Sequence, residues 1–360
     1  MLVEILCAIY VLAQAIFALG LRRGLKREKK RVAGLPTVSV IVCARNEEDN
    51  IDRCVESLSK LEYPALELIV VDDNSDDSTT DKLRVWVNRL PHLRIVDLHG
   101  QERVAQGKVG ALIRGIDAAT GTIICITDAD CVVHPGWVAS YVDCYDEETA
   151  MVSGLTVLDS VNPFACAQSC EMIQLLSMSM SAINHGVPVS IIGNNLSIRK
   201  SAYEEIGGYR NIPFSVTEDI ALFQAMWHSR WKVTFKANEE LLVKSQPVDS
   251  FRTWWRQKQR WIVGGKAIGG PGWVILMLGY LGVLVFLLSL FLPASQLFTV
   301  LAIKCAADLL ILFPVTLKIK RLQLLLFLAI YELYLTFYLL CVPIMYFQKN
   351  VIWKGRDYQT

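Results

Sequence analysis

The sequence predicts an α/β domain with a mostly parallel sheet, joined to membrane-spanning helices. Between residues 37 and 246, short β-branched runs alternate with helical patterns, which is typical of a doubly wound parallel sheet. Hydrophobic residues make up 53% of the chain, and their excess lies at residues 1–21 and 273–346. We therefore expect a polar domain in the middle of the chain and apolar helices at both ends.

The N-terminal segment predicts a membrane span. Residues 2–21 are long enough to cross a bilayer as a helix and contain one acid, Glu4. Seven Lys or Arg residues follow within the linker of residues 22–36, and no small-x-small cleavage site is present, so a cleaved signal peptide is disfavoured. The positive-inside tendency predicts that the polar domain is cytoplasmic, at the plasma membrane if the source is prokaryotic.

About three further spans are predicted at the C-terminal end. The candidate segments are residues 273–292, 297–317 and 322–346. Lys304 and Asp308 lie four residues apart and could pair on one helix face, and Glu332 lies in the third segment. The loop of residues 318–321 has three basic residues and is predicted to be cytoplasmic. Three spans would place the basic tail, residues 347–360, outside, which conflicts with the same rule unless one span is re-entrant or interfacial.

Charge and cysteine usage exclude some classes of protein. The net charge of +1 argues against a nucleic-acid-binding protein, which is usually clearly basic. The ten cysteines show no CxxC spacing, so reduced, buried thiols in a cytosolic compartment are expected.

Within residues 37–246 the elements follow each other as a strand-helix alternation. The predicted strands are residues 37–43, 66–71, 93–98 and 122–127, and the predicted helices are residues 45–61, 78–87 and 109–119. Residues 161–186 are predicted to form either a core helix or an interfacial helix on the membrane. Because ligands of doubly wound sheets bind outside the carboxyl ends of the strands, polar residues there are the candidates for function.

Asp128 and Asp130 follow the fourth predicted strand. Two carboxylates two residues apart can share one Mg²⁺ or Mn²⁺, and such hard ions bridge diphosphate oxygens. An acidic pair in a surface turn is the simpler explanation of the tripeptide alone. Its position after an apolar strand favours the metal site.

Two other groups lie near the same edge. Asp72 and Asp73 follow the second strand and either form a turn or bind imide and ribose hydroxyl donors of a uridine. Lys108 precedes a helix. It either covers the crevice at this edge and contacts a phosphate, or it is simply a solvent-exposed residue of a loop. Further along, Glu218 and Asp219 follow Thr217, which is predicted to cap a helix, and a carboxylate fixed at a helix start is well placed as a general base.

The segment of residues 247–265 is aromatic and basic, which is typical of a membrane interface. An additional role is a contact of Gln257 and Arg260 with a diphosphate or an acceptor, with Trp261 stacking on a sugar or acceptor.

Together the motifs resemble the membrane-bound glycosyltransferase family 2, which includes cellulose, chitin and hyaluronan synthases and ceramide glucosyltransferase. The resemblance covers roughly residues 36–265. It rests on seven motifs in order: Ala44-Arg-Asn-Glu-Glu48, Val71-Asp-Asp-Asn-Ser75, Gly107-Lys108, Asp128-Ala-Asp130, Gly193-Asn-Asn-Leu-Ser-Ile-Arg199 with Gly207-Gly-Tyr209, Thr217-Glu-Asp219 and Gln257-x-x-Arg-Trp261.

The resemblance implies a GT-A fold, an inverting mechanism and a role for each motif. Asp219 would be the general base, Asp128 and Asp130 would bind Mn²⁺ or Mg²⁺, and Glu218 would lie with Gln257, Arg260 and Trp261 at the acceptor and diphosphate end. The residues implied to bind the nucleotide sugar are Ala44, Arg45, Glu47, Asp72, Asp73, Lys108, Asp128 and Ala129. The first loop departs from the family by lacking Pro and an aromatic residue, so stacking on the base would fall to Arg45 or be absent.

About four spans are too few to enclose a polysaccharide channel and look more like ceramide glucosyltransferase. The expected function is therefore a hexosyltransferase that moves one sugar from a UDP-sugar to a lipid hydroxyl in the membrane. The alternative is a processive polysaccharide synthase. A transporter or scaffold that kept the fold is disfavoured, because it has no need of Asp219 beside Asp128 and Asp130.

Overall fold

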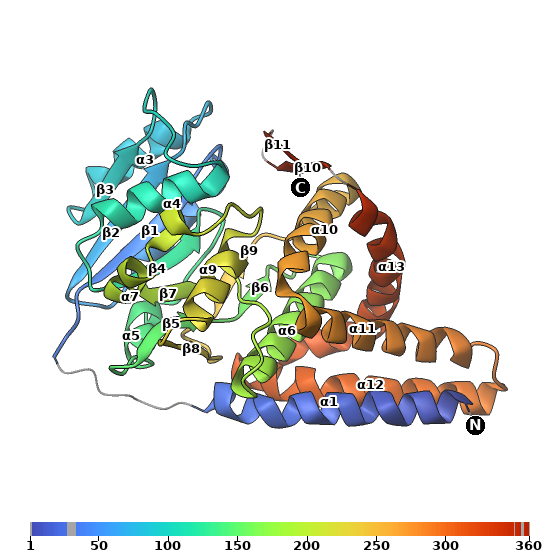
Figure 1. Cartoon of the computed structure of the whole chain (residues 1–360). Coiled ribbons are helices and arrows are strands. Elements are labelled where there is room, and N and C mark those ends of the chain that lie inside the picture. Colours follow the sequence, from blue (N-terminus) through green and yellow to red (C-terminus); the bar gives the residue numbers. More distant parts are fainter. Residues whose placement is uncertain (1, 27–33, 349, 354–355, 360) are drawn as a thin grey trace. The chain divides into compact units, whose positions relative to one another are not determined.

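The computed structural model describes residues 2–26, 34–348, 350–353 and 356–359 (Figure 1). Residues 27–33 of the basic linker and part of the C-terminal tail lie outside these residues. The chain divides into two compact units. We call them the sheet unit, Arg27–Thr156 with Ile191–Gln246, and the helical unit, Met1–Lys26 with Val157–Ser190 and Pro247–Thr360.

The sheet unit is built on seven strands in the order β3-β2-β1-β4-β7-β5-β8. Neighbouring strands are parallel except β7, which is antiparallel to both β4 and β5. The mostly parallel α/β class is therefore confirmed. The strands are β1 (Val38–Ala44), β2 (Leu66–Asp72), β3 (Leu93–Asp97), β4 (Ile123–Asp128), β5 (Thr149–Ser153), β7 (Leu196–Arg199) and β8 (Lys232–Phe235).

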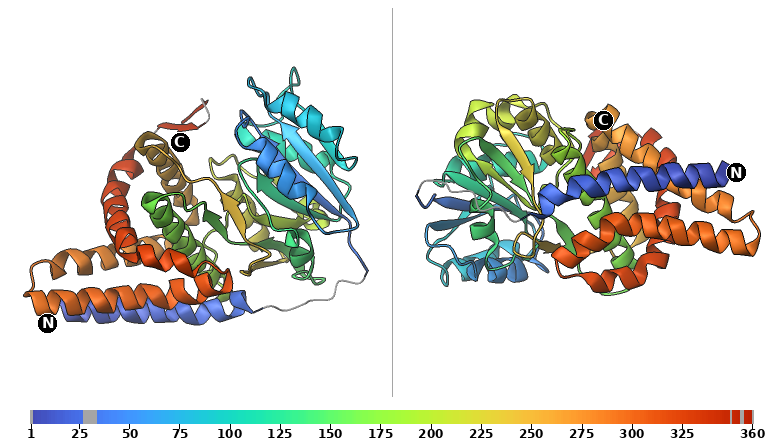
Figure 2. Two further views of the ribbon diagram at one scale, coloured as in Figure 1. Left: turned by 180° about the vertical axis from the view of Figure 1, so that it is seen from behind. Right: turned by 90° about the horizontal axis from the view of Figure 1, so that it is seen from below.

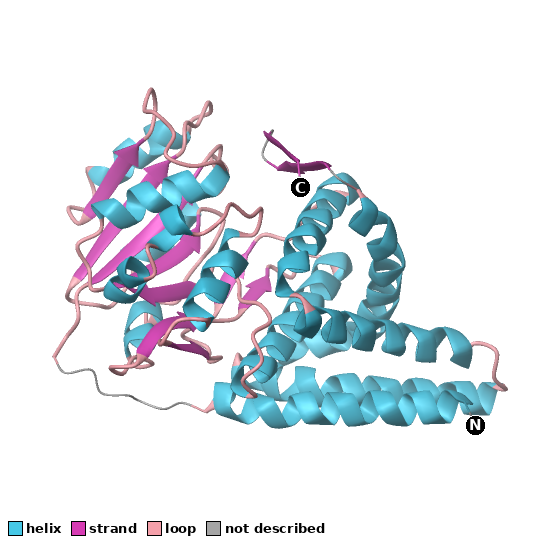
Figure 3. Ribbon diagram, viewed as in Figure 1, coloured by secondary structure: helices cyan, strands magenta, loops and turns pink. Residues whose placement is uncertain are grey.

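Helices cover both faces of this sheet, as the ribbon coloured by structure shows (Figure 3). Alternate β1 residues such as Val40 and Val42 pack with residues of α2 and α5 in one buried cluster. On the other face α4 comes close, because a Cβ at Gly115 would lie 2.8 Å from Cγ2 of Ile41 and 3.0 Å from Cγ2 of Val71. The remaining elements of this part of the chain are α2 (Ile51–Ser59), α3 (Thr79–Val87), α4 (Gly107–Ala118), α5 (Trp137–Val142), β6 (Thr156–Leu158), α7 (Lys200–Glu205), α8 (Gly208–Asn211), α9 (Glu218–Trp227) and β9 (Val243–Ser245).

One predicted helix starts later than expected. The sequence predicts a helix from residue 45, but α2 begins at Ile51. Asn46 takes a positive φ of 52°, which ends the extended run and turns the chain. The backbone N–H of Glu47 then donates to Oγ1 of Thr79 at 2.8 Å instead of entering a helix. The residues between β1 and α2 therefore form a loop, which is tied to residues after β2.

The helical unit contains four helices with the length and composition of membrane spans among the described residues: Leu2–Leu25, Gly270–Ser289, Ala294–Lys318 and Leu322–Phe347. This agrees with the prediction of one N-terminal span and about three C-terminal spans. The cytoplasmic orientation of the polar domain stays a prediction. The helix α1 runs beside α12 in both views of the unit (Figure 2). The elements are α1 (Leu2–Leu25), α6 (Pro163–Asn184), α10 (Phe251–Gly265), η1 (Lys266–Ile268), α11 (Gly270–Ser289), α12 (Ala294–Lys318), η2 (Leu322–Phe327), α13 (Leu328–Phe347), β10 (Asn350–Trp353) and β11 (Arg356–Gln359).

The helix α6 is buried along almost its whole length, including its polar residues Gln168, Glu171 and Gln174. It packs against α1, α12 and α13. On α1, a Cβ at Gly20 would collide with the side chain of Ser181, so the missing side chain lets the two helices approach closely. The burial favours the core-helix alternative for residues 161–186.

A buried polar network connects α1, α12 and α13. Asp308 Oδ1 accepts hydrogen bonds from the Tyr10 hydroxyl at 2.5 Å and from Gln14 Nε2 at 2.9 Å. Lys304 Nζ donates to Asp308 Oδ2 at 3.1 Å, as the four-residue spacing predicted, and also pairs with Glu332 Oε2. Glu332 Oε1 is buried and has no hydrogen-bond partner among the described residues. Asp308 thus accepts from three side chains, those of Tyr10, Gln14 and Lys304, and Lys304 joins it to Glu332.

We expect Lys304→Met to lower the free energy of unfolding much more than Glu332→Gln does. The first leaves the Asp308 carboxylate buried without its cation, which destabilises by about 3–5 kcal/mol. The second keeps the Lys304–Asp308 pair, and the amide oxygen of the new side chain can still accept from Lys304, so it should cost less, about 1 kcal/mol. Thermal unfolding of the purified chain in detergent measures both. Equal losses of stability in the two variants would contradict the central place of Lys304 in this network.

Candidate functional site

The sheet brings three of the predicted clusters to one edge. The β1–β2 register pairs Ala44 with Asp72, and the β1–β4 register pairs Cys43 with Asp128. The carboxyl ends of these three parallel strands are therefore adjacent. This is the edge where ligands bind in doubly wound sheets.

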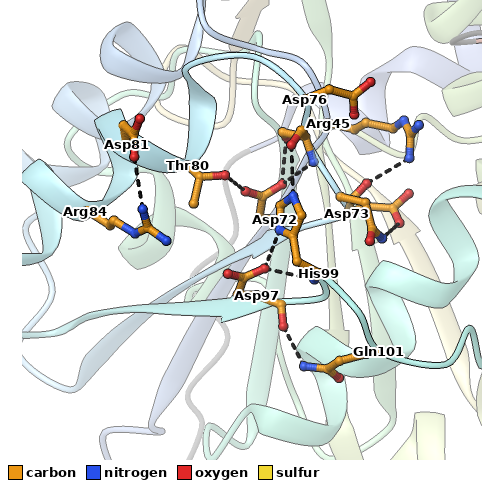
Figure 4. Close-up of polar contacts among 12 residues, drawn as sticks. Arg45, Asp72, Asp73, Asp76, Thr80, Asp81, Arg84, Asp97, His99 and Gln101 are labelled. Carbon is orange, nitrogen blue, oxygen red and sulfur yellow. Dashed lines mark hydrogen bonds and ion pairs between the residues drawn. The ribbon is translucent and has the colours of Figure 1, made fainter.

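Asp72 is fully buried and braces the turn after β2. Its Oδ1 accepts from the Ser75 backbone N–H at 3.0 Å and from the Ser75 hydroxyl at 2.6 Å, and its Oδ2 accepts from Thr80 Oγ1 (Figure 4). Both carboxylate oxygens are thus engaged by the protein itself. The next residue, Asp73, is linked to the first loop, because its N–H donates to the Ala44 carbonyl at 2.8 Å and its carbonyl accepts from Arg45 Nη1 at 2.9 Å.

His99 is a residue that the sequence analysis missed. Its Nδ1 lies 2.6 Å from Asp97 Oδ1, and its Nε2 lies 2.9 Å from the Ser75 carbonyl oxygen (Figure 4). A carboxylate and a carbonyl only accept hydrogen bonds, so both ring nitrogens are placed to donate, which is the geometry of a protonated imidazole. The hydrogen bonds to Asp97 and then to Ser75 raise the pKa of His99. The available signal was two polar residues, Asp97 and His99, at the end of the third strand.

Lys108 is the central cation of the site. It begins the first turn of α4, its side chain is 12% exposed, and its Nζ contacts Asp128 Oδ1 and lies 3.5 Å from Glu218 Oε1. Burial alone would lower its pKa, but the charges of Asp128 and Glu218 outweigh burial and raise it. Lys108 therefore stays charged and links the end of β4 to the start of α9.

Asp130 lies next to Asp128 on the loop after β4, and its Oδ2 accepts from Ser245 Oγ at 2.9 Å. Burial, and then the negative charge of Asp128, raise the pKa of Asp130. A cation shared by the two carboxylates would relieve both effects. Among the described residues, no group of three or more His, Cys, Asp or Glu could hold a metal ion by itself. The pair fits Mg²⁺ or Mn²⁺ ligated by one or two carboxylates, with substrate phosphates and water as the other ligands.

Asp219 lies in the first turn of α9 and has a fixed carboxylate. Its Oδ2 accepts from the Gly193 N–H at 2.7 Å and its Oδ1 from the Ile220 N–H at 2.9 Å. A Cβ at Gly193 would lie 3.1 Å from Asp219 Oδ2, so glycine is needed for this approach. Thr217 occupies the N-cap position but makes no side-chain cap hydrogen bond, contrary to the prediction. Its hydroxyl is instead shared with Ser215 Oγ at 3.2 Å.

The other predicted positions have simple placements. Glu47 Oε2 accepts from Asn50 Nδ2 at 2.9 Å, and Ala129 is buried behind the acidic pair. Gln257, Arg260 and Trp261 are half-buried on α10, in the helical unit. Their contact with the acidic residues of the sheet unit therefore stays a prediction.

The chain is thus an α/β protein with a mostly parallel sheet, and the paired carboxylates, the buried lysine and the helix start near its carboxyl edge make that edge the candidate ligand site. Residues 39–207 match the model of the family described as Glycosyl transferase family 2. The chain therefore carries a glycosyltransferase family 2 domain, as its motifs predicted.

The relatives agree with this assignment. The chain is 27% identical to the probable glycosyltransferase YdaM of Bacillus subtilis over 255 residues, which are 68% of this chain and 59% of that protein. It is 26% identical to the beta-monoglucosyldiacylglycerol synthase of Trichormus variabilis over 277 residues, which are 73% of this chain and 58% of that protein. The chain thus spans less than three-fifths of the length of these relatives.

A solved structure shows the same fold. The mannosyltransferase PcManGT of Pyrobaculum calidifontis, in complex with GDP-Man and Mn²⁺, matches with a TM-score of 0.57 and 20% identity. The match covers 92% of this chain and 98% of the other. This likeness confirms the GT-A fold.

We expect the stabilising effect of His99 to depend on pH. Because its partners raise its pKa, the protonated ring contributes stability that is complete below the ordinary value of about 6.5 and is lost as the pH rises through the raised value. His99→Gln should therefore lower the Tm at about pH 5.5 and have little effect at about pH 9. His92→Gln, a change at an exposed histidine of the same unit, is the control. A pH-independent loss of Tm in His99→Gln would contradict the protonated ring.

Proposed function

We propose that the protein transfers a single sugar from a nucleotide sugar, a UDP-hexose, to a hydroxyl group of a membrane lipid with inversion at the anomeric carbon. One observation carries this proposal. Lys108 joins Asp128, a member of the carboxylate pair, to Glu218, the neighbour of Asp219. The proposed diphosphate site, which lies within the family match of residues 39–207, is thereby connected through a single side chain to the start of α9, where the proposed base lies.

For the nucleotide, Asp73 and the loop of residues 44–47 are the groups we assign to the uracil and ribose. Asp72 supports them, because its carboxylate is engaged by Ser75 and Thr80. Arg45 Nη1 donates to the Asp73 backbone carbonyl, so its guanidinium is held at the end of β2. That placement supports Arg45 as the stacking group in a loop without an aromatic residue.

For the diphosphate, Asp128 and Asp130 would hold the divalent metal. When bound, Mg²⁺ or Mn²⁺ would offset the negative charge of the leaving diphosphate. Lys108 adds a second positive charge close to Asp128. Its raised pKa keeps that charge through the reaction.

Asp219 is the general base of the proposed reaction. The acceptor hydroxyl oxygen bonds to the anomeric carbon while the bond from that carbon to the diphosphate oxygen breaks. The electron pair leaves with UDP, and the hydroxyl proton passes to the Asp219 carboxylate. The N–H groups of Gly193 and Ile220 hold this carboxylate in one orientation, so little reorganisation is needed at the moment of transfer.

A lipid acceptor is supported by the helical unit and by a relative. Four helices in the described part of the chain have the length and composition of membrane spans. The relative named a beta-monoglucosyldiacylglycerol synthase aligns with 73% of this chain. We assign Gln257, Arg260 and Trp261 to the acceptor and diphosphate end, with Glu218. The expected location of the transfer is the cytoplasmic leaflet.

Asp219→Asn should lower kcat by about 100- to 10,000-fold, because it removes the proton acceptor. Donor affinity, measured by calorimetry with UDP-sugar and Mn²⁺, should stay within about threefold, since the nucleotide groups are untouched. The matched control is Asp81→Asn, which breaks an exposed pair with Arg84 on α3 and should leave kcat unchanged. Near-normal kcat in Asp219→Asn would rule out its role as the base.

The chemical identity of the reaction product tests whether the acceptor is a lipid. Purified protein in vesicles that contain diacylglycerol, ceramide or a polyprenyl phosphate, with labelled UDP-hexoses, should yield a lipid carrying one sugar by mass spectrometry. Chelation of divalent metal should abolish transfer. A long polymer would support a processive synthase and overturn the single-transfer proposal.

A further inference from the structure

A buried lysine lies inside the aromatic-basic motif of α10. Lys258 occupies the first unspecified position of Gln257-x-x-Arg-Trp261, between residues assigned to the acceptor end. It is only 2% exposed, although lysine is rarely buried unless it is paired. Neither the motif nor the proposed reaction explains its burial.

The partner of Lys258 is Glu171 on α6. Lys258 Nζ donates to Glu171 Oε1 at 2.8 Å and to Oε2 at 2.6 Å. The Tyr334 hydroxyl of α13 also donates to Oε2, at 2.5 Å, and the Trp254 indole N–H donates to that hydroxyl at 2.9 Å. A carboxylate at the centre of three helices thus holds the ammonium group in one place.

The ammonium group in turn contacts the motif's tryptophan. Lys258 Nζ lies 4.1 Å from the ring centroid of Trp261, well within the range of a cation–π interaction. The two residues are three apart on one helix, so they share a face. Trp261 is half-buried, and its ring is held through Lys258 by a side chain of a different helix.

An ion pair of this kind is a poor choice for stability alone. Two charges lose their hydration on burial, and apolar residues of similar volume often serve as well or better in the same place. A purely structural contact between α6 and α10 would therefore not need Lys258. A charge held over the face of a neighbouring ring can, however, orient that ring through the cation–π attraction.

We propose that Lys258 is a positioning residue that sets the Trp261 ring for the lipid acceptor, and that Glu171 and Tyr334 hold Lys258 in place. The inference rests on the proposed function, in which Trp261 contacts the acceptor. Loss of the Lys258 charge should raise the KM for the acceptor and leave the KM for the donor unchanged, because the nucleotide and metal groups lie on other elements.

The kinetic test uses the purified full chain in lipid vesicles. Lys258→Met should raise the acceptor KM about tenfold, and Lys258→Arg, which keeps the charge, should recover most of the affinity. Trp261→Ala should raise the acceptor KM similarly, and the double variant Lys258→Met with Trp261→Ala should be no worse than Trp261→Ala alone. Additive effects in this cycle would overturn the proposal, as would a rise in donor KM equal to that in acceptor KM.

A spectroscopic test is independent of the acceptor. In protein labelled with 5-fluorotryptophan, the ¹⁹F resonance missing in Trp261→Phe identifies this ring among the nine tryptophans. That resonance should shift or broaden in Lys258→Met and in Tyr334→Phe but not in Lys258→Arg. An unchanged resonance in Lys258→Met contradicts the positioning role. A shifted resonance without transfer to any lipid contradicts only the proposed acceptor, and Tyr334→Phe gives the same readout if Lys258→Met does not fold.

Discussion

The site depends on one buried cation, the ammonium group of Lys108. The carboxyl edge of the sheet and the start of α9 carry Asp128, Asp130 and Glu218 in a partly buried place, where like charges repel strongly. Lys108 offsets this repulsion by contacting two of them. Its position comes from α4, which lies against β1 and β2 through the bare Cα of Gly115. The packing of α4 on the sheet therefore places a positive charge between two acidic residues that would otherwise repel each other.

The two adjacent aspartates at the end of β2 have different roles, which the sequence alone does not distinguish. Asp72 is buried and engaged by Ser75 and Thr80, so it shapes the turn. Asp73, one residue later, has the opposite orientation that follows from the alternation of side chains at a strand end. The support continues through His99, which holds the Ser75 carbonyl. The nucleotide pocket that we propose would therefore be preorganised, because these hydrogen bonds are already made within the protein.

Local patterns predicted the first four strands, their ends and the long apolar helices, because β-branched runs and long apolar segments are typical of buried strands and membrane spans. They did not predict β5, β7 and β8. Such patterns could not predict contacts between residues that are far apart in the sequence. The start of α2 was predicted too early because Asn46 and Glu47 bond to Ser75 and Thr79, about thirty residues away. The role of α6 was ambiguous because the partner of Glu171 is Lys258, on a different helix. A buried carboxylate and a solvated one look the same in a sequence.

Lys304 and Lys258 are both buried in the helical unit and both form ion pairs, but the two pairs have different roles. Between apolar helices in lipid there is little hydrophobic drive toward one register, so a polar pair can select it. Lys304 does this by joining Asp308 and Glu332, and the residues around it belong to none of the seven motifs. Lys258 also joins two helices, but its ammonium group faces the ring of Trp261. The first pair therefore joins α12 to α13, whereas we propose that the second orients a side chain of the Gln257–Trp261 motif.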